Sequence, residues 1–315
     1  MKNYSALFCN KYVMLILMLI SMGAEADCYT NQSGAVAVTD NIAAANFTVQ
    51  RDTPVGTTIG TISVPASGQE VLACDSDNSS FYYAMLLFTT PSSISGYYNT
   101  NVPGVGVKMS GFSNPATVYY MGIGGNTDAK VRTVEFVKTG DIVSGVTSSG
   151  LFAAIQTSDQ STKAVSYNMA ATTITQVACA ITTPNLSFPI GDVPASSFGT
   201  SVGTTPSGAE KTQNLGLNCD AGANINVSLS GTQNPDVATD SVMALTGQGN
   251  AGVAGGVGVQ LLYNGSPLEL NNRIVLKQSS GGQETFPLTA RYYQTKTSVT
   301  TGSANTSATL TLTYQ

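Results

Sequence analysis

The sequence predicts an all-β protein made of two β-sandwich domains in tandem. Composition is the first observation behind this prediction: Thr, Ser, Val, Gly and Asn are abundant, and charged residues make up only 10% of the chain. No long segment follows the 3.6-residue period of an amphipathic helix. Length is the second observation, because 315 residues exceed what one small β-domain needs and suit two domains.

A repeated order of motifs is the third observation. Each half contains a cysteine, then a second cysteine, then a Gly-Val-Gly-Val segment. These are Cys28, Cys74 and residues 104–107 in the first half, and Cys179, Cys219 and residues 256–259 in the second. The shared order indicates one sandwich plan used twice.

Residues 1–26 have the pattern of a secretory signal peptide. They contain a basic start, an apolar run and a small-residue cleavage site (Lys2 and Lys11, residues 13–20, and residues 24–26). We therefore expect an exported, soluble mature chain that begins at Asp27. The apolar run is shorter than the roughly 20 residues of a membrane span, and no later segment approaches that length.

The chain carries a formal charge of −5 and no histidine. A net negative charge gives the protein no electrostatic reason to bind nucleic acid or an anionic membrane. Without histidine or a Cys-x-x-Cys pair, the sequence predicts no metal site, and it suggests no cofactor.

Four cysteines remain after the expected cleavage: Cys28, Cys74, Cys179 and Cys219. An even number in an exported chain suggests two disulfides, for which three connectivities are possible. The sequential connectivity, 28 to 74 and 179 to 219, places one bridge in each half.

Alternating or β-rich segments bounded by turn residues predict the strands in order. In the first half these are residues 47–50, 57–64, 81–89, 105–109, 117–121, 131–138 and 151–157. We expect the domain boundary between Asn168 and Cys179. The second half has candidates at residues 225–230, 258–263, 273–277 and 286–293, with a Gly-rich loop at 247–256.

The last predicted strand covers residues 302–315. At a period of two, one face carries Gly302, Ala304, Thr306, Ala308, Leu310, Leu312 and Tyr314, and the other face is polar. A half-buried strand at a chain terminus is typical of a sheet edge, and its apolar face suggests an edge that accepts a partner.

The second half resembles a chaperone-usher pilin domain. The resemblance covers residues 179–315 and rests on Cys179, Cys219, residues 256–265, residues 289–293, Gly302 and the penultimate Tyr314. In the first half, residues 100–107 are similar to a strand of fimbrial adhesin domains. The two-domain layout looks like a type 1 fimbrial tip adhesin.

This resemblance implies two immunoglobulin-like sandwiches, with a receptor-binding head at residues 27–175 and a pilin domain at 179–315. The pilin domain would lack its last strand. A periplasmic chaperone, and then a strand from the adjacent fimbrial subunit delivered at the outer-membrane usher, would fill the resulting groove. The residues expected to line it are Gly302, Ala308, Leu310, Leu312 and Tyr314.

The position of Cys28 favours a tip subunit over a shaft subunit. A donor arm of about 10 to 20 alternating residues would have to precede the first disulfide-bonded strand, but Cys28 is the second residue after the expected cleavage site. We therefore expect a protein that accepts a strand and donates none, exposed at the fimbrial tip on the cell surface.

Polar residues in two head loops are candidates for binding a receptor, which the resemblance suggests is a host glycan or glycoprotein. These residues are Asp75, Asp77, Asn78, Gln156 and Asp159. Carboxylates and amides can hydrogen-bond adjacent sugar hydroxyls; the alternative is a set of solvated Asx-turns. An exposed ring of the tyrosine doublets at 82–83, 97–98 and 119–120 could stack on a sugar.

Two other functions compete with a receptor-binding adhesin. A minor pilin could terminate the fibre without binding a receptor. A glycosidase would need a carboxylate pair, and no pair stands out in this sequence. We expect no enzymatic activity. The mature start Asp27-Cys28 lacks the aromatic first residue of mannose-specific heads, so mannose specificity does not carry over.

Overall fold

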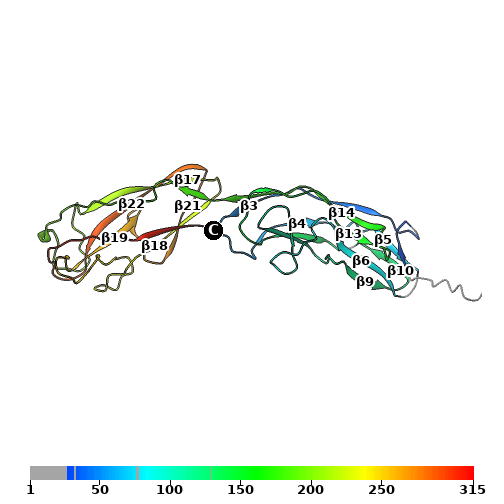
Figure 1. Cartoon of the computed structure of the whole chain (residues 1–315), viewed down its shortest axis with the longest axis horizontal. Coiled ribbons are helices and arrows are strands. Elements are labelled where there is room, and N and C mark those ends of the chain that lie inside the picture. The colour runs from blue at the N-terminus through cyan, green and yellow to red at the C-terminus, as the bar shows by residue number, and fades with distance from the viewer. Residues whose placement is uncertain (1–26, 32, 76–77, 129) are drawn as a thin grey trace, which may run out of the picture.

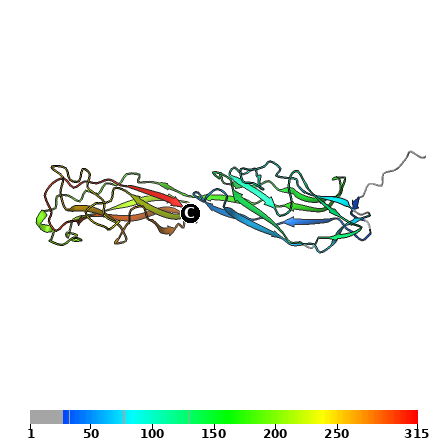
Figure 2. The ribbon, with the colours of Figure 1, turned by 90° about the horizontal axis from the view of Figure 1, so that it is seen from below.

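The computed structural model describes residues 27–31, 33–75, 78–128 and 130–315, so the expected signal peptide at 1–26 lies outside the described residues. The molecule is elongated, with two strand-rich halves placed end to end (Figures 1 and 2). The carboxyl terminus lies near the middle of the molecule, where the halves meet (Figure 1). The all-β prediction is confirmed, and no described helix is long and apolar enough to cross a membrane.

The first half contains four sheets. Their strand orders are β2-β14-β13-β6-β9, β4-β11-β8-β7, β12-β15-β3 and β1-β5-β10. The strands of the two larger sheets are β2 (Val38–Ile42), β14 (Lys163–Met169), β13 (Gly150–Gln156), β6 (Ser79–Met85), β9 (Thr117–Met121), β4 (Thr58–Val64), β11 (Arg132–Lys138), β8 (Val105–Met109) and β7 (Tyr98–Asn99). Those of the smaller sheets are β12 (Gly145–Val146), β15 (Thr173–Val177), β3 (Asn46–Gln50), β1 (Cys28–Tyr29), β5 (Glu70–Cys74) and β10 (Gly124–Thr127).

The second half contains two sheets, with orders β16-β17-β22-β19-β20 and β21-β18-β23. Their strands are β16 (Cys179–Ile181), β17 (Glu210–Cys219), β22 (Gly282–Gln294), β19 (Val257–Tyr263), β20 (Ser266–Pro267), β21 (Arg273–Gln278), β18 (Asn224–Ser230) and β23 (Thr309–Tyr314). A short 3-10 helix covers Ala195–Ser197. The connection between β16 and β17 is otherwise irregular.

Each half encloses its own hydrophobic core. The first contains Phe136, Phe152 and Tyr167, which are fully buried, and the second contains Leu217, Ile225 and Tyr314. Buried residues alternate with exposed or half-buried ones along much of β22, which is the pattern expected for packed sheets. The two cores share no residue.

Both disulfides follow the sequential connectivity, which confirms one bridge in each half. Cys28 is bonded to Cys74, and Cys179 to Cys219. In each pair the cysteines face each other across an antiparallel ladder, between β1 and β5 and between β16 and β17. The bridges therefore tie the first strand of each half to a neighbouring strand.

The tail strand is shorter than predicted. The ladder between β23 and β18 begins at Thr309, which pairs with Ser230, and Ser230 is the last residue of β18. Upstream of this point the chain pairs with the Gly-rich loop instead. The amide of Ala254 donates to the carbonyl of Ser303 at 3.0 Å, and the amide of Ser303 donates to Gly252 at 2.9 Å. An alternating pattern in the sequence can be longer than the strand that forms, because the strand extends only as far as its partner strand does.

Candidate functional site: an open groove and a polar distal end

The strand β23 lies at a sheet edge. Within the described residues it pairs only with β18, in an antiparallel register that places Leu310 opposite Leu229 and Leu312 opposite Val227. Its other edge faces a groove of about 1010 Å³. As far as Leu312, the backbone groups along that edge are therefore available to a further strand. The backbone groups of Tyr314 are bonded to Asp52.

The floor of the groove is apolar because strands of both sheets turn their inward faces towards it. The side chains come from β17, β18, β19 and β22 and include Leu215, Leu229, Val259, Leu261, Leu288 and Ala290. All six belong to the second core and are less than a tenth exposed. The groove is thus an opening into the core of the second half.

Residues 181–198 form the opposite wall. In this segment Leu186, Phe188 and Ile190 recur at every second position, half-buried against the core, while their neighbours are exposed. The alternation is that of a strand, yet all of residues 182–209 are described and none lies in one. Pro184 and Pro189 interrupt the run of backbone donors along this wall.

Four of the five tail residues predicted for the groove do line it. Leu310 and Leu312 project from β23, and Ala308 and Gly302 precede them along the same wall. A glycine is required at position 302, because a Cβ there would overlap the backbone nitrogen of Ala254. The glycine lets the tail pass close to the Gly-rich loop.

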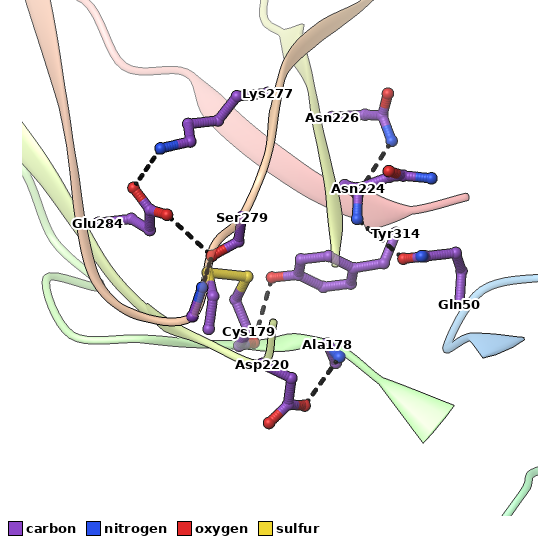
Figure 3. Close-up of a disulfide and its surroundings, with 12 residues drawn as sticks. Gln50, Ala178, Cys179, Asp220, Asn224, Asn226, Lys277, Ser279, Glu284 and Tyr314 are labelled. Carbon is purple, nitrogen blue, oxygen red and sulfur yellow. Dashed lines mark hydrogen bonds and ion pairs between the residues drawn. A yellow bond between two sulfur atoms is a disulfide. The ribbon is translucent and has the colours of Figure 1, made fainter. Parts of the chain in front are cut away.

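Tyr314 does not line the groove, contrary to the sequence prediction. Its ring is 1% exposed, and its hydroxyl donates to the carbonyl oxygen of Cys179 at 3.1 Å (Figure 3). Burial raises the pKa of this phenol, although the nearby Arg51 opposes the shift. Tyr314 shares the parity of Leu312, but it sits where β23 reaches the other half of the molecule, so the second core closes around it.

The distal end of the first half brings the two predicted polar loops together. The amide of Asp27 donates to Oδ1 of Asp75 at 3.3 Å, and the hydroxyl of Ser158 donates to Oδ1 of Asp27. Asn78 is exposed and has a positive φ of 73°. Asp77 lies outside the described residues. One residue, Asp27, thus links the loop after Cys74 to the late turn.

Two of the predicted head residues serve the turn itself. Gln156 is 7% exposed, and its amide donates to the carbonyl of Gln160 at 3.0 Å. Asp159 accepts hydrogen bonds from the hydroxyls of Ser161 and Thr157, which lower its pKa to about 2. Local bonding of this kind is that of the Asx-turn alternative.

The tyrosine doublets differ in exposure. Tyr83 and Tyr98 are buried, whereas Tyr120 is 65% exposed and Tyr119 is 37% exposed. Both tyrosines of the third doublet lie on β9, which within the described residues pairs only with β6. Among the described residues, no group of three or more acidic or sulfur ligands could hold a metal ion.

A family model described as Fimbrial protein matches residues 167–315. This region is similar to the fimbrial protein family. The matched region contains the groove, both of its walls and the disulfide beside Tyr314.

The whole chain resembles fimbrial adhesins of the chaperone-usher type. It is 27% identical over 323 residues to the "Fimbria adhesin protein" of Klebsiella pneumoniae, which covers 96% of this chain and 99% of that protein. Fimbrial adhesins and pilins are structural or binding proteins and not enzymes.

Solved structures of fimbrial proteins show only weak likeness to this chain. The receptor binding domain of the adhesin MrkD1P of Klebsiella pneumoniae is 21% identical with a TM-score of 0.40, covering 50% of this chain and 99% of that domain. The CupB6 tip adhesin of Pseudomonas aeruginosa is 14% identical with a TM-score of 0.38, covering 87% and 93%. At these scores neither likeness carries an argument about fold or function.

Sequence reasoning missed one wall of the groove in the fimbrial region. Residues 182–198 gave no strand signal strong enough to be included, because prolines interrupt them. The structure places none of these residues in a strand. The alternation of Leu186, Phe188 and Ile190 was the signal that could have found this wall.

Proposed function

We propose that this protein is a fimbrial tip adhesin. Residues 27 to about 175 form a head that binds a surface receptor, and residues 179–315 form a pilin domain that anchors the head to the fimbria. One observation carries the proposal: an open groove of about 1010 Å³ lies between the free edge of β23 and residues 181–198, above an apolar floor. Such an opening suits a strand supplied by another protein.

The periplasmic chaperone, and later the adjacent fimbrial subunit, supply that strand. Main-chain hydrogen bonds to the edge of β23 give affinity, and alternate side chains of the incoming strand enter the groove beside Leu310 and Leu312. The usher in the outer membrane then exports the protein, and the head is displayed at the tip on the cell surface.

Expression in a bacterial periplasm tests the anchoring role. The full chain should co-purify with a two-domain pilus chaperone, and a strand bound to the folded groove should raise the chain's stability by mass action. Recovery of a stable chain alone, in equal yield with and without the chaperone, would count against an open acceptor groove.

The head binds a host glycan at its distal end in this proposal. The support is the exposed Tyr120 ring on β9, together with the loop at Asp75 and Asn78. An exposed ring can stack on the apolar face of a sugar while carboxylate and amide groups bond its hydroxyls.

A glycan array and a cell-binding assay, both with the chaperone-stabilised full chain, test receptor binding. Tyr120→Ala should weaken the glycan signal, whereas Thr311→Ala on β23 should leave it unchanged. If no glycan binds above background and fibres lacking the head still assemble without losing adhesion, the protein is a capping subunit instead.

A further inference from the structure

The junction between the two halves contains almost no free linker. Strand β15 ends at Val177 and β16 begins at Cys179, so Ala178 alone separates them. Its amide donates to Oδ2 of Asp220 at 3.0 Å, and its carbonyl accepts from the amide of Asp220 at 2.9 Å (Figure 3). Domains joined by flexible linkers move independently by default, and this connection is fixed on both sides.

Val177 belongs to both halves at once. Its backbone pairs with Gln50 in the parallel ladder between β15 and β3, which is part of the first half. Its side chain is 3% exposed and packs into the core of the second half. The last strand of the head therefore ends inside the pilin domain.

Gln50 reaches across the junction with both ends of its side-chain amide. Its Nε2 donates to the carbonyl of Gly222 at 2.8 Å, and its Oε1 accepts from the amide of Asn224 at 2.9 Å (Figure 3). Asn224 is the first residue of β18, the strand that pairs with β23. One glutamine of the head thus contacts the base of the sheet that borders the groove.

Asp52 binds the end of β23 itself. Its amide donates to the carbonyl of Tyr314 at 3.1 Å, and its Oδ2 accepts from the amide of Tyr314 at 2.9 Å. The guanidinium of Arg51 lies 4.5 Å from the centre of the Tyr314 ring and 2.9 Å from Oδ1 of Asp52. These bonds satisfy both backbone groups of Tyr314 on the side facing the head.

The strand β23 therefore borders the groove and also contacts the head. Leu310 and Leu312 line the groove, and Tyr314, two residues further on, is held by the head. We propose that residues 50–52 form a clamp that couples the groove to the head, so that a strand filling the groove also stabilises β3 and β15. The contacts of Arg51 and Asp52 with Tyr314 form only while the end of β23 is ordered. An added neighbour orders β23, so the two events favour each other.

Hydrogen exchange of the full chain tests this coupling. Leu312→Val loosens β23 by removing one methylene from the groove wall, and Leu312→Ala does so more strongly. With the clamp intact, either variant should raise exchange in residues 46–50 and 173–177 by at least about fivefold, the low end of common coupling strengths. Combined with Asp52→Ala, the same variants should change exchange there by less than about twofold.

Two matched controls define the result. Leu276→Val makes the same change on β21, at the other edge of the same sheet, and should leave exchange in residues 46–50 unchanged. Asp141→Ala replaces an exposed aspartate of the head and should not reduce the response to Leu312→Val. An equal response with and without Asp52, or an equal response to Leu276→Val, would overturn the clamp.

The proposal rests on the proposed function only for the nature of the strand that fills the groove. The exchange comparison uses this chain alone, so it reads the coupling directly. Failure of the adhesin proposal would be seen elsewhere, as absent chaperone recovery, and would leave the response to Leu312→Val in place.

Discussion

The hydroxyl of Tyr314 and the carbonyl of Cys179 are joined by a hydrogen bond of 3.1 Å. This bond connects β23 to β16, the first strand of the second half, at the disulfide with Cys219. The ring is buried in the second core and does not line the groove.

Tyr314→Phe should lower the free energy of unfolding by about 1 to 3 kcal/mol, because a buried carbonyl loses its hydrogen-bond donor. Urea titration of the full chain measures the change. Tyr120→Phe, which alters an exposed ring, should have an effect below about 0.5 kcal/mol. Equal effects of the two variants would show that the bond to Cys179 contributes nothing.

Leu310→Asp or Leu312→Asp should abolish recovery of the protein with its chaperone. Each change places a charge in an apolar groove that an incoming strand must cover. Thr311 lies between them on β23 with its side chain exposed, so Thr311→Asp is the matched control and should be recovered normally. Normal recovery of the leucine variants would refute the groove as the acceptor site.

Gly302→Ala should destabilise the second half by about 1 to 3 kcal/mol, because its Cβ would overlap the backbone of the Gly-rich loop at Ala254. Thermal unfolding of the chaperone-free chain measures the loss. Ser307→Ala, at an exposed tail position, serves as the comparison. A Gly302→Ala protein as stable as this control would contradict the close approach.

The clamp at Asp52 should depend on pH. Burial alone would raise the pKa of this carboxyl, but hydrogen bonds from Arg51 and from the amide of Tyr314, with the charge of Lys138, lower it overall from its ordinary 3.8. A lowered pKa in the folded state means that the carboxylate stabilises the fold fully above its unfolded pKa. That contribution is lost as the pH falls through the folded pKa.

Stability measurements of the native chain and Asp52→Asn between pH 7 and pH 3 test this sign. The difference between the two proteins should be constant from neutral pH down to about pH 5 and should shrink below about pH 4. A difference that grows on acidification would show that the carboxylate opposes the folded state.

The sequence predicted the features that can be recognised within one segment, without knowing which strand lies beside it. Alternation at residues 302–315 placed Leu310 and Leu312 on an apolar edge, and the cysteine order suggested one bridge in each half; the structure contains both features. Periodicity reports which face of a strand is buried. It does not report where the neighbouring strand ends. The sequence alone therefore could not show that the tail strand begins only at Thr309.

Contacts between distant parts of the chain were beyond sequence reasoning. Asp52 and Tyr314 are 262 residues apart, and neither residue differs in type from ordinary loop or strand residues. In the head, the polar loops at Asp75 and at residues 156–159 were found by composition. Composition could not tell that Gln156 and Asp159 direct their hydrogen bonds into their own turn.

The direction of β23 determines how the molecule would respond to a pull. This strand runs along the long axis (Figure 2) and pairs with β18 at six positions, from Thr309 to Tyr314. Antiparallel hydrogen bonds lie across the strands, so a pull along the axis would load all of these bonds together in shear. A strand pulled sideways would lose its hydrogen bonds one at a time, so a smaller force would detach it.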